Sequence, residues 1–156
     1  IEVTLARVPY SLWKTFAPYH YMSADLHKAA QCYAAFVHDR PVSFAALLPR
    51  PVSSGRDKGK AIHGVSRVVT LPDYQGLGLA FVLLDSLGGM FVNKGQRLNN
   101  YPAHPAFIEA HSKSDNWRQV KKSGSYSSKS MGGIGPSGGR PCGVYSYVGP
   151  KLDIVL

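Results

Sequence analysis

The chain has 156 residues, which is the length of one domain, and 44% of them are hydrophobic. That share is enough to build a core, so a chain that is disordered throughout is excluded. Its 18 Lys and Arg against 9 Asp and Glu give a net charge of +9, which favours polyanionic partners such as nucleic acid or phosphorylated cofactors.

The sequence carries few signals for membrane insertion, secretion or disulfide formation. No run of about 18 apolar residues is present, so we expect no membrane-spanning helix, and the first ten residues lack the basic and apolar regions of a signal peptide. The two cysteines, Cys32 and Cys142, form no C-x-x-C pair, which favours a reducing, cytoplasmic compartment. Because the sequence starts at Ile1 without Met, we expect a leader or a short extension before it.

The N-terminal part predicts a strand followed by helices. Residues 1–9 alternate in hydrophobicity and end at a proline, which is typical of a short strand. Residues 10–31 carry two helical patterns separated near Pro18, and Ser23 or Asp25 can cap the second helix.

The next part predicts β-structure. Residues 33–37 and 42–48 favour the two strands of a hairpin, with His38-Asp39-Arg40-Pro41 as its turn. Residues 49–60 are a loop by their Pro, Gly, Ser and charge content, and residues 61–72 form a β-rich run that stops at a proline.

The C-terminal half predicts helices alternating with strands. In residues 79–95 apolar side chains recur at helical spacing, although Gly88-Gly89 weakens the centre. Residues 96–103 are a weaker strand candidate, and residues 104–117 begin with a proline suited to the first turn of a helix.

Residues 122–141 are rich in Gly and Ser and predict a flexible loop within the domain, and residues 142–149 alternate like a strand. The order of elements predicts one mixed α/β (α+β) domain over residues 1–156, with a largely antiparallel sheet flanked by helices.

Basic residues gather in two stretches, and both stretches predict loops. The second also contains aromatic side chains, a mixture that allows a loop to hold phosphates and to stack on bases. An ordinary solubilising loop is the alternative interpretation. The residues that we expect to contact DNA or RNA are Arg56, Lys58, Lys60, Lys113, Trp117, Arg118, Lys121 and Lys122.

The most informative segment, residues 63–84, turns from a strand into a helix through glycines. Such a turn presents backbone N–H groups at a positive helix end, where phosphate binds. A dinucleotide fingerprint is excluded because Phe81 stands where its third small residue belongs, and a P-loop is excluded because no Gly-Lys-Ser or Gly-Lys-Thr follows.

Gln75-Gly76-Leu77-Gly78-Leu79-Ala80 resembles the [QR]-x-x-G-x-[GA] pyrophosphate loop of the GNAT superfamily of acyl-CoA-dependent N-acyltransferases. Thr70-Leu71-Pro72-Asp73-Tyr74, just before it, resembles the V-x-P-x-[YF] segment that ends a bulged strand in that family. The order of elements also matches the family over nearly the whole chain, so the resemblance implies a GNAT-like acyltransferase fold.

The resemblance implies that acetyl-CoA, or another acyl-CoA, lies in a cleft between two splayed neighbouring strands. The pyrophosphate would bind the loop amides, the pantetheine would pair with the strand backbone, and Ser112 could bind the thiol. At Gly76 and Gly78 a Cβ would meet the phosphate oxygens. The implied cofactor-binding residues are Val69, Thr70, Leu71, Gln75, Gly76, Leu77, Gly78, Leu79, Ala80 and Ser112.

For the acid that protonates the departing thiolate, the family often uses a Tyr in a pattern like A-x-x-x-Y-x-K-x-G-F. Aligned with it, His111 stands at the tyrosine and Trp117 at the phenylalanine. A histidine can donate a proton near neutral pH, although a water-facing histidine on the helix surface is an equal alternative.

For the acceptor side, the resemblance implicates Tyr19-His20-Tyr21-Met22-Ser23, of which His20 and Tyr21 are the candidates for acceptor contact or proton transfer. A phage-type subgroup with Y-H-Y-L-S, R-x-V-V-x-P-D-Y-Q-G and H-P-A motifs is the best match. Its counterparts here are Tyr19 to Ser23, Arg67 to Gly76, and His104 to Ala106.

The remaining catalytic candidates are Ser66 and Asp73. Ser66 and Arg67 are neighbours on a strand, so only one of them is expected to face the cleft. Asp73 is the nearest carboxylate and suits capping as readily as catalysis. An ordered water could replace a dedicated base. The six histidines form no metal-binding pair, so no metal site is expected.

Three functions follow from this reading. The first is acyl transfer to an amine of a nucleic-acid base in a bacterial or phage-infected cell, similar to the Mom family of phage DNA-modification proteins. The second is acetylation of a small-molecule amine or a protein lysine. The third is a GNAT-like module that binds nucleic acid without catalysis.

Overall fold

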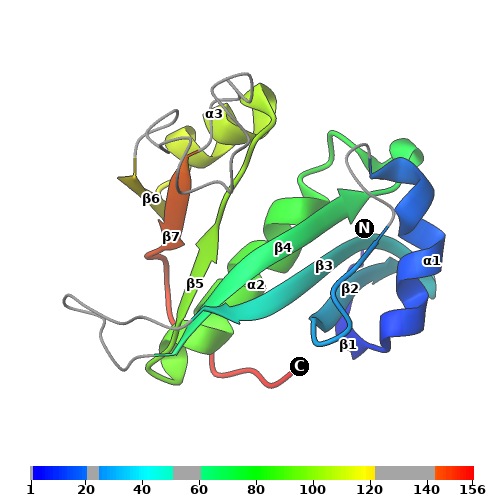
Figure 1. The fold of residues 1–156 in the computed structure, drawn as a ribbon, viewed down its shortest axis with the longest axis horizontal. Coiled ribbons are helices and arrows are strands. Elements are labelled where there is room, and N and C mark those ends of the chain that lie inside the picture. The colour runs from blue at the N-terminus through cyan, green and yellow to red at the C-terminus, as the bar shows by residue number, and fades with distance from the viewer. Residues whose placement is uncertain (1, 21–24, 51–60, 122–142) are drawn as a thin grey trace.

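The computed structural model describes residues 2–20, 25–50, 61–121 and 143–156. Within them, seven strands form one sheet in the order β1-β2-β3-β4-β5-β7-β6 (Figure 1). Neighbouring strands are antiparallel except β4 and β5, which are parallel. The predicted mixed α/β fold with a largely antiparallel sheet is confirmed.

The strands are β1 (Thr4–Val8), β2 (Gln31–Val37), β3 (Arg40–Arg50), β4 (Ile62–Thr70), β5 (Arg97–Asn100), β6 (Trp117–Lys121) and β7 (Val144–Tyr147). The helices are α1 (Trp13–Phe16), α2 (Leu79–Asn93) and α3 (Pro105–Lys113). Short 3₁₀ turns flank α1 at Tyr10–Leu12 and Ala17–Tyr19, and another covers Pro72–Tyr74. None of the described helices is long and apolar enough to cross a bilayer.

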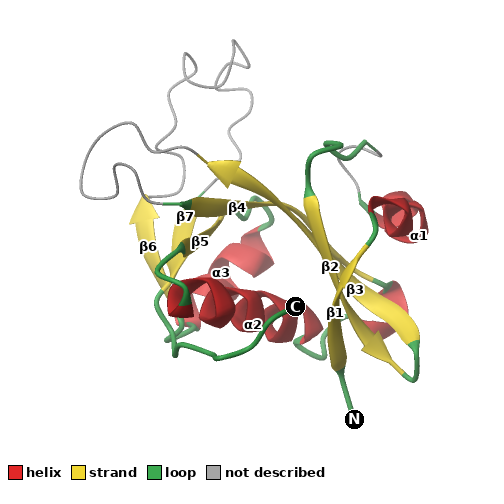
Figure 2. Ribbon diagram, turned by 90° about the horizontal axis from the view of Figure 1, so that it is seen from below, coloured by secondary structure: helices red, strands yellow, loops and turns green. Residues whose placement is uncertain are grey.

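The two faces of the sheet are covered by different helices. Phe44 and Ala46 of β3 pack with Trp13 and Phe16 of α1. The alternate residues of β3, such as Leu47, belong to the core cluster that contains the buried face of α2. This alternation follows from the two-residue period of a strand. Figure 2 shows α1 and α2 on either side of the central strands.

The predicted hairpin is confirmed as β2 and β3, but the predicted second helix is wrong in its described part. Residues 25–30 contain no helix. Instead, the carbonyl of His27 accepts a hydrogen bond from the Ala30 N–H, and its ring Nδ1 accepts one from the Ala29 N–H. A side chain that takes a backbone N–H in this way favours a turn over a helix.

The helix expected over residues 104–117 is shorter than its pattern indicates. α3 ends at Lys113, where the Ser114 side chain accepts a hydrogen bond from the Asn116 N–H and turns the chain. Trp117 then begins β6, which pairs with β7. The stretch from Trp117 to Lys121, which the sequence analysis assigned to a basic loop, is therefore an edge strand.

β4 and β5 separate after a short ladder. Their pairing covers only Ile62–Gly64 against Arg97–Asn99, while β4 continues to Thr70 with β3 as its remaining neighbour. At the end of β5, the Asn100 side chain accepts a hydrogen bond from the Tyr101 N–H and takes the chain out of the ladder. The expected pair of splayed strands is thus confirmed, and one backbone edge of β4 is left open.

Gly88 and Gly89 allow α2 to pack closely against the C-terminal part of the chain. A Cβ on Gly88 would lie within 2.7 Å of three ring atoms of Tyr147, and one on Gly89 would lie 2.5 Å from Cγ of Leu152. The glycines that weaken the helix locally are therefore required where it contacts β7 and the segment after it.

We predict that Gly88→Ala lowers the free energy of unfolding by about 1–3 kcal/mol, because the overpacking exceeds the gain in helix propensity. Urea unfolding measures the change. Val82→Ala, at an exposed position of the same helix, should change it by less than about 0.5 kcal/mol. A Gly88→Ala protein as stable as the parent would contradict the close packing against Tyr147.

Candidate active site

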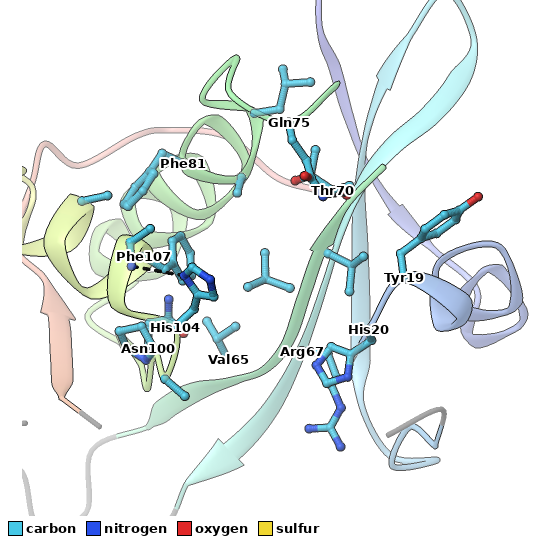
Figure 3. Close-up of a pocket in the computed structure, with 18 of the residues that line it drawn as sticks. Tyr19, His20, Val65, Arg67, Thr70, Gln75, Phe81, Asn100, His104 and Phe107 are labelled. Atoms are coloured by element: carbon cyan, nitrogen blue, oxygen red, sulfur yellow. Dashed lines mark hydrogen bonds between the residues drawn. The ribbon is translucent and has the colours of Figure 1, made fainter. Parts of the chain in front are cut away.

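A cavity of about 940 Å³ runs along the open edge of β4 (Figure 3). Four segments form its walls: the end of the turn after α1, β4 from Val65 to Thr70, residues 74–81, and residues 100–110. Segments far apart in the sequence therefore meet where β5 leaves the sheet. Most of the residues expected to bind the cofactor line this cavity, and so does His20 from the expected acceptor side.

One end of the cavity is the loop that leads into α2. Gly76 and Gly78 have positive φ angles of 82° and 74°, and a Cβ on either would meet no atom within 4 Å. Gly78 directly precedes the helix, whose first turn carries no acidic residue. The side chain of Gln75 donates a hydrogen bond to the carbonyl of Thr70 and closes the loop.

These features fit a pyrophosphate. The amides at the start of α2 are at the positive end of the helix dipole, and the space beside the glycines is open. Gln75, Gly76, Gly78, Leu79 and Ala80 line the cavity as expected. Leu77, in contrast, has a 55% exposed side chain that is not part of the lining, so only its backbone can contribute.

The adjoining strand offers its backbone to an extended ligand. Val69 and Thr70 line the cavity. The expectation for Leu71 is corrected: its N–H donates to the carbonyl of Val42, and its own carbonyl accepts from the Tyr74 N–H. Because its N–H is already paired and Leu71 is not among the lining residues, Leu71 is not placed to pair with the pantetheine.

A β-bulge lies at Ser66. The β3–β4 register places Ala46 opposite Arg67 and Leu47 opposite Val65, which leaves Ser66 without a residue opposite. Both Ser66 and Arg67 line the cavity. The alternation on which the expectation of a single cleft-facing side chain rests is interrupted here, because a bulge breaks the two-residue period of a strand.

The other end of the cavity lies on the α1 side of the sheet, with Tyr19, His20 and Arg67 in its wall. Figure 3 shows His20 and Arg67 away from Gln75 and Phe81, which lie beside the start of α2. The ring of His20 meets that of Trp13 edge-on, with centroids 5.9 Å apart. Tyr21 lies outside the described residues.

His111 does not reach the cavity. Its side chain is fully buried, its Nδ1 donates to the carbonyl of Phe107 at 2.8 Å, and its Nε2 accepts from the Asn100 side chain at 2.9 Å. Burial is the main effect on its pKa and lowers it, so the ring is held neutral. The expected role as the acid is therefore corrected: His111 links α3 to the end of β5.

Ser112 and Asp73 also lie outside the lining. The hydroxyl of Ser112 is exposed and donates to the carbonyl of Glu109 within α3. Asp73 is exposed in the first turn of the 3₁₀ helix before the loop. The expectation that Ser112 binds the thiol is therefore wrong. Asp73 is an exposed carboxylate near the glycine loop.

His104 is not among the catalytic residues expected from the sequence, but it lines the cavity. His104 is the N-cap of α3, and its Nδ1 accepts a hydrogen bond from the Ala106 N–H at 3.1 Å. A ring nitrogen that accepts carries no proton, so the neutral ring holds its proton on Nε2. In the sequence, the pair His104-Pro105 indicates the start of a helix, but it does not indicate that His104 lines a cavity.

Of the described residues that line the cavity, none is Asp or Glu, and Arg67 is the only Lys or Arg. In the described part of the chain, no three His, Cys, Asp or Glu side chains are grouped as metal ligands would be.

Only part of the expected nucleic-acid surface can be placed. The expectation that Trp117 contacts nucleic acid is wrong. Trp117 is 5% exposed and its ring N–H donates to Asp85 at 2.7 Å, so it cannot stack on a base. Lys113 forms an exposed ion pair with Glu109, and Arg118 is exposed on β6. Lys121 ends β6, whereas Arg56, Lys58, Lys60, Lys122 and the loop expected at 122–141 lie outside the described residues.

Comparison with known proteins identifies the family to which this fold belongs. The model of the acetyltransferase (GNAT) family matches residues 4–107. The chain therefore belongs to the GNAT family and is an acetyltransferase. A search of curated proteins gave no match.

Solved structures share the fold at low sequence identity. Naa50 of Arabidopsis thaliana, in complex with a bisubstrate analogue of CoA, has a TM-score of 0.64 and 16% identity, covering 96% of this chain and all of that one. The ribosomal-protein-S18-alanine N-acetyltransferase of Escherichia coli has a TM-score of 0.60 and 14% identity, covering 99% of this chain and all of that one. NAA60 of A. thaliana, in complex with acetyl-CoA, has a TM-score of 0.64 and 11% identity, covering 94% and 98%.

We predict that Gly78→Glu raises the dissociation constant of acetyl-CoA by about a hundredfold or more, because it places a carboxylate where the pyrophosphate should lie. Isothermal titration calorimetry measures the change. Gly95→Glu is the matched control, because Gly95 has a similar φ of 76° and open space, but lies outside the cavity. If both variants lower the affinity for acetyl-CoA equally, the effect comes from backbone strain, which would contradict a phosphate site at Gly78.

Proposed function

We propose that this acetyltransferase transfers the acetyl group of acetyl-CoA to an exocyclic amine of a nucleic-acid base. The observation that carries the proposal is that, among the described residues lining the cavity, Arg67 is the one Lys or Arg and none is Asp or Glu. An aliphatic amine such as lysine is a cation near neutral pH and must lose a proton before it attacks. The amine of a base is neutral, so it requires no carboxylate to attract or deprotonate it.

Acetyl-CoA would bind with its pyrophosphate on the amides of residues 75–80. Its pantetheine would lie along the open edge of β4 between Val65 and Thr70, which brings the thioester to the point where β4 and β5 separate. Naa50 and NAA60, solved with a CoA analogue and with acetyl-CoA, support this cofactor for a chain of the same fold. Acetyl-CoA supplies the activated acyl carbon.

In the transfer, the amine nitrogen attacks the thioester carbon, the C–S bond breaks and the thiolate departs. The departing sulfur takes up one proton, and the amine nitrogen loses one. The Nε2–H of His104 is the donor that we assign to the thioester oxygen or to the thiolate. His20 or an ordered water takes the proton of the amine, and Ser66 lines the same cavity.

The charge of the chain supports a polyanionic acceptor. A net charge of +9 attracts nucleic acid through a field that salt screens. The resemblance of residues 19–23, 67–76 and 104–106 to the phage-type subgroup points to the same acceptor. A base within a duplex would have to be flipped out, so single strands should be the better substrate.

The second candidate is an amine of a protein or a small molecule. It is favoured by structural likeness, since the E. coli neighbour is named for acetylating an alanine of ribosomal protein S18. The third candidate, a module that binds nucleic acid without catalysis, requires that no acceptor be modified.

The test is incubation with acetyl-CoA and three acceptors: single-stranded DNA, single-stranded RNA and a peptide with a free N-terminus and a lysine. Digestion and mass spectrometry identify the product. We expect an acetylated nucleoside from DNA or RNA. Modification of the peptide alone would contradict the nucleic-acid acceptor, and no transfer together with salt-sensitive DNA binding would indicate the binding module.

His104→Asn should lower kcat by about a hundredfold while the affinity for acetyl-CoA is unchanged, because Asn caps a helix but lacks the Nε2 proton. His38→Asn is the control, since His38 lies in the hairpin turn with a φ of 48°, a conformation that Asn tolerates. An unchanged kcat in His104→Asn would exclude His104 as the proton donor.

A further inference from the structure

Arg67 leaves the sheet at the acceptor end of the cavity. It lies opposite Ala46 in the β3–β4 ladder, and residues opposite each other share a face. Ala46 packs in the cluster with Trp13 and Phe16, so Arg67 is on the α1 face. In Figure 3 it extends from β4 on the side of His20, away from the glycine loop.

Within the described part of the chain, the hydrogen bonds of the guanidinium go to backbone carbonyls. Nη1 donates to the carbonyl of Ser66 at 2.8 Å, and Nη2 reaches the carbonyl of Asp25 at 3.5 Å. Nε is buried and has no hydrogen-bond partner among the described residues. Of the five N–H donors that a guanidinium carries, these two bonds use one on each Nη and leave the rest for another group.

This arrangement is costly for the folded protein. A buried N–H without a partner destabilises the folded state, and a partly buried cation is stable when an anion neutralises it. Two carbonyls orient the guanidinium without cancelling its charge, and no Asp or Glu is among the described residues that line the cavity. An anion that enters the cavity from outside would supply the missing charge.

We propose that Arg67 forms an anion subsite at the acceptor end, which binds one phosphate or carboxylate of the molecule that carries the acceptor amine. The inference rests on the proposed function, because it places the acceptor on this side of the bulge. Arginine suits the role because its planar fork binds such groups through two parallel hydrogen bonds.

The bulge prepares this subsite. The extra residue, Ser66, turns its carbonyl toward Arg67 and binds Nη1, which fixes the guanidinium against its own strand. Less side-chain freedom is then lost when the anion binds. For a nucleic acid the anion is a phosphate beside the target base, and for an amino acid or peptide it is a carboxylate.

The test measures binding and does not depend on turnover. Protein loaded with CoA is titrated calorimetrically with deoxycytidine 5′-monophosphate and with deoxycytidine, which share one amine and differ by the phosphate. Glycine and glycinamide form the second pair and differ by the carboxylate. In at least one pair, the parent protein should bind the anionic member about tenfold or more tightly, as for a charge-assisted bidentate bond.

Arg67→Gln should bring the two members of that pair to nearly equal affinity, while Arg67→Lys keeps part of the preference. Arg118→Gln is the matched control, because it removes the same charge from an exposed site on β6. Its preference should equal that of the parent. Thermal unfolding of each variant shows whether it is folded. If Arg67→Gln does not fold, a reduced preference for the anionic member in Arg67→Lys is the test of the subsite.

Two results would overturn the subsite: neither pair shows a preference in the parent, or Arg67→Gln keeps the preference. If Arg67→Gln and Arg118→Gln lose the preference for the anionic member equally, that preference comes from the overall positive charge of the protein and not from the subsite. A preference in the glycine pair alone would keep the subsite and contradict the nucleic-acid acceptor. The inference and the proposed function can thus fail separately.

Discussion

The separation of β5 from β4 is the constraint on which the rest of the site depends. The two strands pair over three residues and then part, because the Asn100 side chain takes the next backbone N–H and turns the chain toward α3. β4 keeps β3 on one side and loses its neighbour on the other. A backbone edge that would otherwise be paired within the sheet is thereby available to a ligand.

The buried pair of Asn100 and His111 maintains that separation. The neutral ring of His111 is hydrogen-bonded at both nitrogens, to α3 on one side and to the end of β5 on the other. It packs among Phe81, Phe107 and Trp117, so α2, α3 and β6 meet at one ring. A histidine that could have served as an acid serves instead to hold the far wall of the cavity.

Local features of the fold and the site could be predicted from the sequence. The glycine loop depends on backbone N–H groups and positive φ angles within a few residues, so residues 75–80 are sufficient to indicate it. The hairpin, β4 and α2 have strong periodicity of their own. The bulge, the burial of Trp117 and the role of His104 depend on pairing or packing with distant segments. No pattern within β6 shows that it joins β7, and none near Ser66 shows which residue of β3 lies opposite.

Amide hydrogen exchange with and without acetyl-CoA shows whether the cofactor lies along the open edge of β4. We expect slower exchange at residues 76–80 and at the amides of β4 between Val65 and Thr70 that do not bond to β3. The β1–β2 ladder should be unchanged. Saturating acetyl-CoA that leaves both segments unchanged, or protects only residues outside the cavity, would contradict a cofactor bound along the open edge of β4.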